Sequence, residues 1–205
     1  MQSLLRIFFR FLYHQFAFAY DLVAALVSFG HWQDWTLEVI PFIIGNRTLE
    51  IGPGPGHLQR ILLSRGLAAV AIDESAPMTR LAQRNTNRKS QLTRGLAQQL
   101  PFADSSFDTV IATFPAEYIT NPLTMLEVRR CLSDGGRFIV LPAALPKNQL
   151  LAWLFKITGQ ASSDALKIIK EKLEEPFINA KFEVKTHVLD RKSGTLLIVV
   201  AKKQK

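Results

Sequence analysis

Gly52, Gly54 and Gly56 alternate with two prolines directly after a short apolar run, a spacing that can serve ligand binding. Helical apolar spacing resumes over residues 58–63, so the glycines are expected to join a buried strand to a helix. Glycine lets a ligand touch bare backbone where the strand ends. Proline has no N–H to donate, which weakens a phosphate cradle. Glu50 would repel a pyrophosphate and attract an ammonium, as in S-adenosylmethionine. A purely structural turn is the alternative.

A second apolar run, over residues 68–72, ends in Asp73, 21 residues after Gly52. An acid at this distance, at the tip of the second strand, is placed to accept hydrogen bonds from both hydroxyls of a ribose. The alternative is that Asp73 is the N-cap of a helix beginning near Pro77, a role for which Ser75 competes. We expect ribose binding, because the spacing from the glycines fits it.

Four motifs follow one another along the chain: LEIGPGPG at 49–56, AIDESAPM at 71–78, GLAQQLPFADSSFDTVIATF at 95–114 and LEVRRCLSDGGRFIVL at 126–141. In this order they resemble class I S-adenosylmethionine-dependent methyltransferases of the type 11 group, which includes the ubiquinone/menaquinone biosynthesis C-methyltransferases. Upstream, YDL at 20–22, SFG at 28–30 and Trp35 are similar to a segment of the quinone-methylating branch. The resemblance implies S-adenosylmethionine as the cofactor and a small-molecule methyl acceptor.

The same resemblance implies a set of cofactor-binding residues: Glu50, Gly52, Gly54, Gly56, Asp73, Glu74, Met78, Leu96, Ala97, Gln98 and Thr113. One of these departs from the family pattern. Most relatives carry an acid that accepts a hydrogen bond from the adenine amino group, whereas Leu96 can only pack on the ring. Adenine recognition is therefore expected to fall on backbone groups around Ala97 and Gln98, or on the Gln98 side chain.

Candidate catalytic residues follow the fourth predicted strand, where residues 113–118 should form a wall facing the acceptor. Glu117 could deprotonate a hydroxyl or a ring carbon, and Tyr118 could orient it. The alternative is that Glu117 caps or forms an ion pair while Tyr118 packs. His31 is a second candidate base and is otherwise an exposed loop histidine. A base is needed only if the acceptor must lose a proton.

Strands and helices alternate, which predicts a doubly wound α/β fold with a mostly parallel seven-stranded sheet. We expect a buried strand approach over 39–44 and 48–51, and strands over 107–113 and 137–141. An amphipathic helix is expected over 123–132, stopping at Asp134–Gly136, with an apolar spacing of three to four that runs through Leu123, Leu126, Arg130, Cys131 and Leu132. Strands over 182–189 and 194–201 should form an antiparallel C-terminal hairpin. Residues 1–36 are expected to form an N-terminal segment and residues 37–205 the methyltransferase domain.

Composition narrows the classes of protein. The chain has 205 residues, is 48% hydrophobic and carries a formal net charge of +8, which suits one domain with an acidic partner or surface. Arg80, Arg84 and Arg88 recur at helical spacing; we expect a solvated face, with RNA methylation as the alternative, because no aromatic residues that could stack bases are interleaved. One cysteine excludes an intramolecular disulfide, and four scattered histidines predict no metal site.

The first 29 residues are rich in phenylalanine and leucine, but Arg6, Arg10, His14 and Asp21 interrupt every window long enough to span a bilayer. We expect either a helix in a membrane interface or a lid on the catalytic domain. The sequence thus predicts a cytoplasmic enzyme, peripheral on the inner face of the membrane in the first case. Its acceptor is expected to be apolar, such as a quinone or lipid. A non-catalytic binding protein of the same fold and a nicotinamide-dependent oxidoreductase are the competing classes, and the sequence predicts no oligomeric state.

Overall fold

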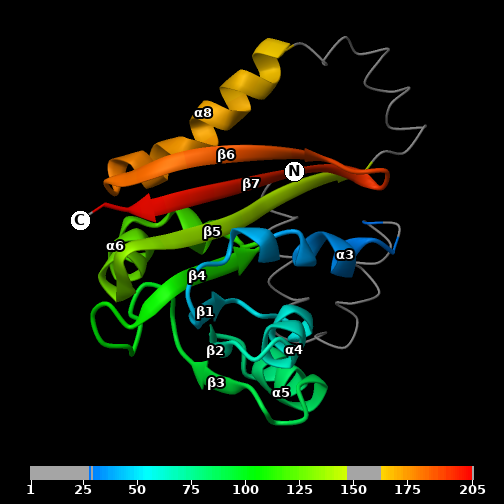
Figure 1. Ribbon diagram of the computed structural model, residues 1–205, viewed down its shortest axis with the longest axis vertical. Coiled ribbons are helices and arrows are strands. Elements are labelled where there is room, and N and C mark those ends of the chain that lie inside the picture. Colours follow the sequence, from blue (N-terminus) through cyan, green and yellow to red (C-terminus); the bar gives the residue numbers. More distant parts are fainter. Residues whose placement is uncertain (1–27, 29, 147–162, 205) are drawn as a thin grey trace.

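The computed structural model describes residues 28, 30–146 and 163–204, and its centre is a seven-stranded sheet (Figure 1). The strands are β1 (Arg47–Ile51), β2 (Ala68–Asp73), β3 (Gln91–Arg94), β4 (Phe107–Thr113), β5 (Leu132–Pro146), β6 (Phe182–Asp190) and β7 (Gly194–Lys203). The helices are α3 (Trp32–Leu37), α4 (His57–Ser64), α5 (Ala76–Asn85), α6 (Pro122–Cys131) and α8 (Ser163–Asn179), with short 3₁₀ helices η2 (Ile40–Phe42) and η3 (Glu117–Thr120).

The strand order is β3-β2-β1-β4-β5-β7-β6. The pairs among β1 to β5 are parallel, whereas β7 is antiparallel to both β5 and β6. This confirms the predicted doubly wound sheet and its C-terminal hairpin. The chain leaves β1 toward β2 on one side and later returns to β4 on the other, so a crevice opens where the carboxyl ends of β1 and β4 meet.

The central strands β1, β4 and β7 are buried on both faces, as their continuous apolar runs require. Alternate residues of β5 point to opposite sides: Phe138 and Val140 join a cluster with α6 and α8, whereas Ile139 and Leu141 join a cluster with α3 and α4. Figure 1 shows α4 and α5 beside the β1 to β3 half of the sheet and α8 along β6. The fold therefore fixes the strand ends between two packed layers.

Three local expectations were wrong. Residues 39–44 form no strand, because Pro41 lies in η2 and β1 begins only at Arg47. In α6, Leu123 and Leu126 are 56% and 59% exposed, because the helix turns a different stripe, Thr124, Met125, Val128 and Cys131, toward the sheet. Strand β5 begins at Leu132, not at residue 137, because Leu132 already pairs with Phe107 ahead of the glycines.

The N-terminal segment reaches the described structure at Ser28 and α3. Trp35 of α3 is buried against the α4 face of the sheet, and its indole Nε1 donates a hydrogen bond to Ser193 Oγ at 3.0 Å. Residues 1–27, on which the interface and lid hypotheses rest, lie outside the described residues. In the described part of the chain, no helix is both long and apolar enough to cross a membrane.

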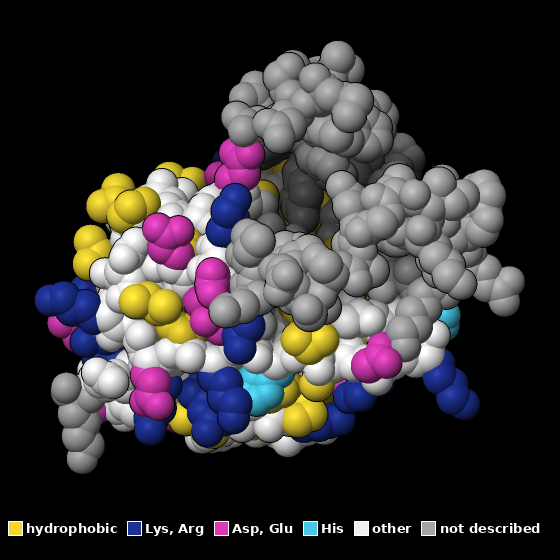
Figure 2. Space-filling view, turned by 90° about the horizontal axis from the view of Figure 1, so that it is seen from above, with side chains coloured by type: hydrophobic (Ala, Val, Ile, Leu, Met, Phe, Trp, Pro, Cys, Tyr) yellow, Lys and Arg dark blue, Asp and Glu magenta, His cyan; other side chains and the backbone are white. Residues whose placement is uncertain are grey.

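The arginines at helical spacing lie at the surface. Arg80, Arg84 and Arg88 are all exposed on or just after α5. On the face seen in Figure 2, Lys and Arg side chains lie in small groups among Asp and Glu side chains and form no continuous patch on the coloured, described surface.

Candidate functional site

The turn between β1 and α4 has the left-handed backbone that its glycines predict. The φ angles are +71° at Gly52, +53° at Gly54 and +82° at Gly56, which is also the N-cap of α4. A Cβ at Gly52 would lie 2.6 Å from the Tyr118 hydroxyl, and one at Gly56 would lie 3.0 Å from the backbone of Ala82. The turn therefore lets neighbouring groups approach closely on two sides.

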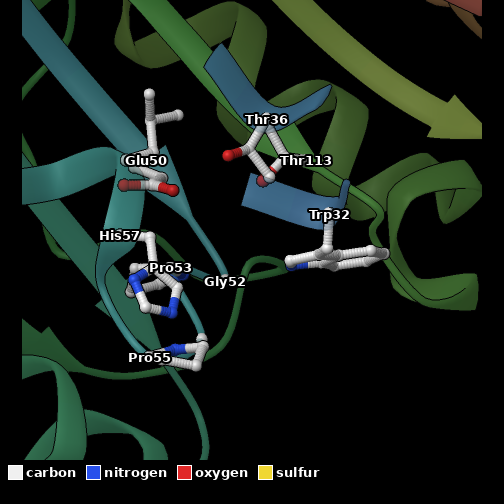
Figure 3. Close-up of a pocket in the computed structure, with 10 residues that line it drawn as sticks. Trp32, Thr36, Glu50, Gly52, Pro53, Pro55, His57 and Thr113 are labelled. Atoms are coloured by element: carbon white, nitrogen blue, oxygen red, sulfur yellow. The ribbon is translucent and has the colours of Figure 1, made fainter. Parts of the chain in front are cut away.

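A small hollow opens beside this turn (Figure 3). It is lined by Trp32, Thr36, Glu50, Gly52, Pro53, Gly54, Pro55, His57, Leu58 and Thr113. In Figure 3, Glu50 and Trp32 lie on opposite sides, with Thr36 and Thr113 between them. The hollow lies where β1 and β4 end, at the point where the strand order reverses.

Six of these residues are absent from the sequence-based set of site residues: Trp32, Thr36, Pro53, Pro55, His57 and Leu58. Trp32 and Thr36 come from α3, which the sequence places in a separate N-terminal segment, and His57 immediately follows the glycines. Trp32 stacks on Phe114, the residue after β4, with ring centroids 3.8 Å apart. One sequence feature could have indicated a role for Trp32: it lies three residues before the motif residue Trp35.

Glu50 is the most perturbed acid of the hollow. Glu50 is 1% exposed, and its Oε2 atom has no hydrogen-bond partner among the residues that the structure describes. The pKa of Glu50 is raised to about 7: burial raises it most and the nearby negative charge of Asp73 also raises it, while a hydrogen bond from Gln59 lowers it. A cation placed in the hollow would favour the ionised carboxylate.

Asp73 ends β2 and is 7% exposed. The capping alternative for it is wrong, because the N-cap of α5 is Ser75, whose Oγ accepts a hydrogen bond from the backbone N–H of Met78 at 3.4 Å. Asp73 Oδ1 instead accepts from the backbone N–H of Ser75 at 2.8 Å. Glu74 is exposed, and the Met78 side chain is fully buried.

The loop after β3 carries the residues expected to contact adenine. Leu96 is 49% exposed, Ala97 is buried in the core cluster and Gln98 is half-buried. They do not line the hollow. The loop is fastened to α6, because Glu127 accepts a hydrogen bond from the Leu100 backbone N–H at 2.8 Å, and Arg130 donates to the carbonyl oxygens of Leu100 and Phe102.

The three catalytic candidates lie in different places. Tyr118 packs against the core and donates a hydrogen bond to the carbonyl of Ile51 at 3.4 Å, so its hydroxyl lies directly beside the glycine turn. Glu117 is exposed in η3 and is not part of the hollow's lining. His31 lines a different, open depression with Asp34 and Arg191. The structure therefore brings only Tyr118 to the glycine turn.

The structure also addresses the expectations for the cysteine and for metal binding. Cys131 is fully buried, as predicted, and burial raises the pKa of its thiol to about 11. Within residues 28, 30–146 and 163–204, no group of three or more His, Cys, Asp or Glu side chains could hold a metal ion.

Comparison with known proteins addresses the identity of this site. Residues 49–140, which span β1 to β5, match the family described as a methyltransferase domain (Methyltransf_11). Over these residues the chain is therefore similar to a methyltransferase domain. Over 144 residues it is 29% identical to a demethylmenaquinone methyltransferase of Tropheryma whipplei, an alignment that covers 68% of this chain and 60% of that protein. It is 33% identical over 153 residues to a ubiquinone/menaquinone biosynthesis C-methyltransferase of Cellvibrio japonicus, covering 68% and 61%.

The chain thus spans about three fifths of the length of these relatives. Its fold also matches a methyltransferase chain solved in complex with the Haloferax volcanii Trm112 methyltransferase activator. That match has a TM-score of 0.63 and 19% identity, and it covers 93% of this chain and 99% of that one. At this identity the structural match supports the fold, and the matched domain indicates S-adenosylmethionine as the cofactor.

The site fits this cofactor. Glu50 Oε2 is a buried acceptor with no partner in the described part of the chain, which suits the ammonium of the methionine moiety. The left-handed turn at Gly52 and Gly54 leaves backbone exposed to the hollow, and the prolines between the glycines suit a ligand without phosphate. Asp73 lies at the end of the neighbouring strand β2, where it could accept hydrogen bonds from the ribose hydroxyls of the cofactor.

Proposed function

We propose that this protein transfers the methyl group of S-adenosylmethionine to an apolar small molecule, with a quinone as the favoured acceptor class. The observation that carries the proposal is the buried carboxylate of Glu50, which lies beside the glycine turn with one oxygen that has no partner in the structure. Burying such a group is costly unless a ligand completes it. The names of the relatives, which methylate demethylmenaquinone or act in quinone biosynthesis, support the acceptor class.

We assign different binding roles to the residues around the hollow. Glu50 would hold the ammonium of the cofactor and Asp73 its ribose hydroxyls. The stacked rings of Trp32 and Phe114 would offer a flat apolar surface to a ring-shaped acceptor. When bound, S-adenosylmethionine supplies an already activated methyl group. The protein therefore mainly has to align the acceptor and exclude water.

The roles of the remaining predicted residues stay proposals. Leu96, exposed on the loop after β3, would cover the adenine, with backbone groups of Ala97 and the Gln98 side chain as hydrogen-bonding partners. Thr113 lines the hollow from the end of β4. Glu117 would accept a proton from the methyl acceptor if the reaction requires its loss. Tyr118, whose hydroxyl lies beside Gly52, would orient the acceptor.

We also propose that the protein works in the cytoplasm, attached to the inner face of the membrane through residues 1–18. Vesicle sedimentation tests this attachment. Deleting residues 1–18 should abolish binding to anionic vesicles, binding that weakens with salt because Arg6 and Arg10 contribute to it, while cofactor affinity survives. If the intact protein does not sediment with vesicles at low salt, the attachment is refuted.

The main experiment has two stages. Calorimetric titration with S-adenosylmethionine and with NAD should detect binding of the first ligand only; binding of NAD alone would overturn the proposal. Incubation with isotopically methyl-labelled S-adenosylmethionine and membrane extracts, followed by mass spectrometry, should then place the label in the quinone or lipid fraction. Label in RNA alone, or cofactor binding without any labelled product, would refute the proposed acceptor or the catalysis.

A further inference from the structure

A chain of buried polar side chains leads from Ser90 through Gln59 to Glu50. Gln59 in α4 is fully buried, and Ser90, just before β3, is 8% exposed. Ser90 Oγ donates a hydrogen bond to Gln59 Oε1 at 2.8 Å. Gln59 Nε2 donates to the carbonyl of Val70 at 3.4 Å, and the Gln59 side chain also hydrogen-bonds Glu50. Buried polar side chains in an otherwise apolar interface are costly, so their arrangement requires a reason.

The hydrogen bonds fix which way the Gln59 amide faces. Its oxygen is occupied by the Ser90 hydroxyl, so both N–H donors are left for two acceptors, the Val70 carbonyl and the Glu50 carboxylate. Without the Ser90 hydroxyl, the amide could rotate and turn its oxygen toward the carboxylate. Oxygen facing oxygen would repel the ionised form of Glu50.

We propose that Gln59 and Ser90 are positioning residues that keep the Glu50 carboxylate ionised and aim its free oxygen, Oε2, into the hollow. The proposal rests on the proposed function, because the ligand that this oxygen would meet is the ammonium of S-adenosylmethionine. Gln59 and Ser90 themselves do not line the hollow and would act through Glu50. None of the motifs in the sequence includes either residue.

Gln59 is the hydrogen-bond partner that lowers the pKa of Glu50. Asp73, on the adjacent strand β2, repels the ionised carboxylate. His57 lines the hollow from α4, and Thr36 and Thr113 line it from α3 and β4. Gln59 is therefore the group that the structure places in a hydrogen bond with Glu50 in favour of its charged form.

The direct test measures Glu50 in the protein without cofactor. Carboxyl ¹³C NMR of glutamate-labelled protein, with the Glu50 signal assigned through Glu50→Gln, should give a titration midpoint near 7. In Gln59→Met, which keeps the volume but removes the hydrogen bond, the midpoint should rise by about one pH unit, and Ser90→Ala should raise it in the same direction. Ser90→Thr keeps the hydroxyl and should retain the original midpoint.

The second readout is affinity for S-adenosylhomocysteine, which carries the same amino-acid moiety and is chemically stable. The wild type should bind it about tenfold more tightly than Gln59→Met at pH 6, and within about twofold at pH 8.5, because both carboxylates are then ionised. Titration of the ligand's own amine is common to both proteins and cancels in the ratio.

The outcomes separate the two proposals. If the wild type binds neither S-adenosylmethionine nor its product, the proposed function fails, and the NMR midpoint alone decides the role of Gln59 and Ser90. If the wild type binds, but Gln59→Met and Ser90→Ala leave the Glu50 midpoint and the pH dependence unchanged, the positioning role is overturned. A lower melting temperature with an unchanged midpoint means that the pair only stabilises the fold.

Discussion

Replacing Glu50 with Gln should stabilise the cofactor-free protein at neutral and higher pH. Below pH 4.5 the Glu50 carboxyl is protonated in both the folded and the unfolded chain, so its ionisation does not change the free energy of unfolding. Between 4.5 and about 7 the unfolded chain loses this proton and the folded chain keeps it, so the free energy of unfolding falls as pH rises. Above 7 the loss is constant.

The loss of unfolding free energy can be calculated from the difference between the two pKa values of Glu50. A pKa of about 7 against a usual 4.5, at 1.36 kcal/mol per pH unit, corresponds to about 3 kcal/mol at pH 8 and less than about 1 kcal/mol at pH 5. The amide introduced by Glu50→Gln carries no charge, so this substitution should recover most of the energy. For a chain of this size the melting temperature at pH 8 should rise by about 6 to 12 °C.

Urea unfolding of the two proteins at pH 5 and pH 8 measures the effect directly. The exposed acid Glu183 in β6 provides a matched control, since Glu183→Gln should change stability by less than about 0.5 kcal/mol at either pH. Binding of S-adenosylmethionine should weaken in Glu50→Gln, so stability and affinity should move in opposite directions. A variant no more stable than the wild type at pH 8 would refute the reasoning that burial of this carboxylate opposes folding.

Three further changes test other parts of the site. Gly54→Val forces a β-branched side chain to φ +53° beside the hollow, so calorimetry should detect no cofactor binding and stability should fall by about 1 to 3 kcal/mol; affinity within a few-fold of wild type would contradict the site. Asp73→Asn should weaken binding by about 1 to 3 kcal/mol at an unchanged melting temperature, whereas the matched cap variant Ser75→Ala should cost about 1 kcal/mol of stability and spare affinity. Arg130→Met should release the loop at 95–104, seen as faster amide hydrogen exchange there; unchanged exchange would mean that α6 does not hold the loop.

Local patterns in the sequence were sufficient for the order of the elements and the type of sheet. Apolar runs buried on both faces, separated by helical segments, leave few arrangements other than a parallel doubly wound sheet. The same patterns misplaced the buried face of α6. Leu123 and Leu126 satisfy helical spacing as well as Met125 and Val128 do, and only packing against the sheet decided which stripe is buried.

By itself, the sequence determined the positions of Glu50, the glycine turn and Asp73, because parallel strands bring their carboxyl ends to one edge of the sheet. Only the tertiary structure decided what surrounds them. It brought Trp32 into the hollow and left His31 in another depression, although the two are adjacent in sequence. It also joined Gln59 to Ser90 across 31 residues. The physical reason is that burial and hydrogen bonding, which set the pKa of Glu50, depend on contacts between distant residues that no local spacing encodes.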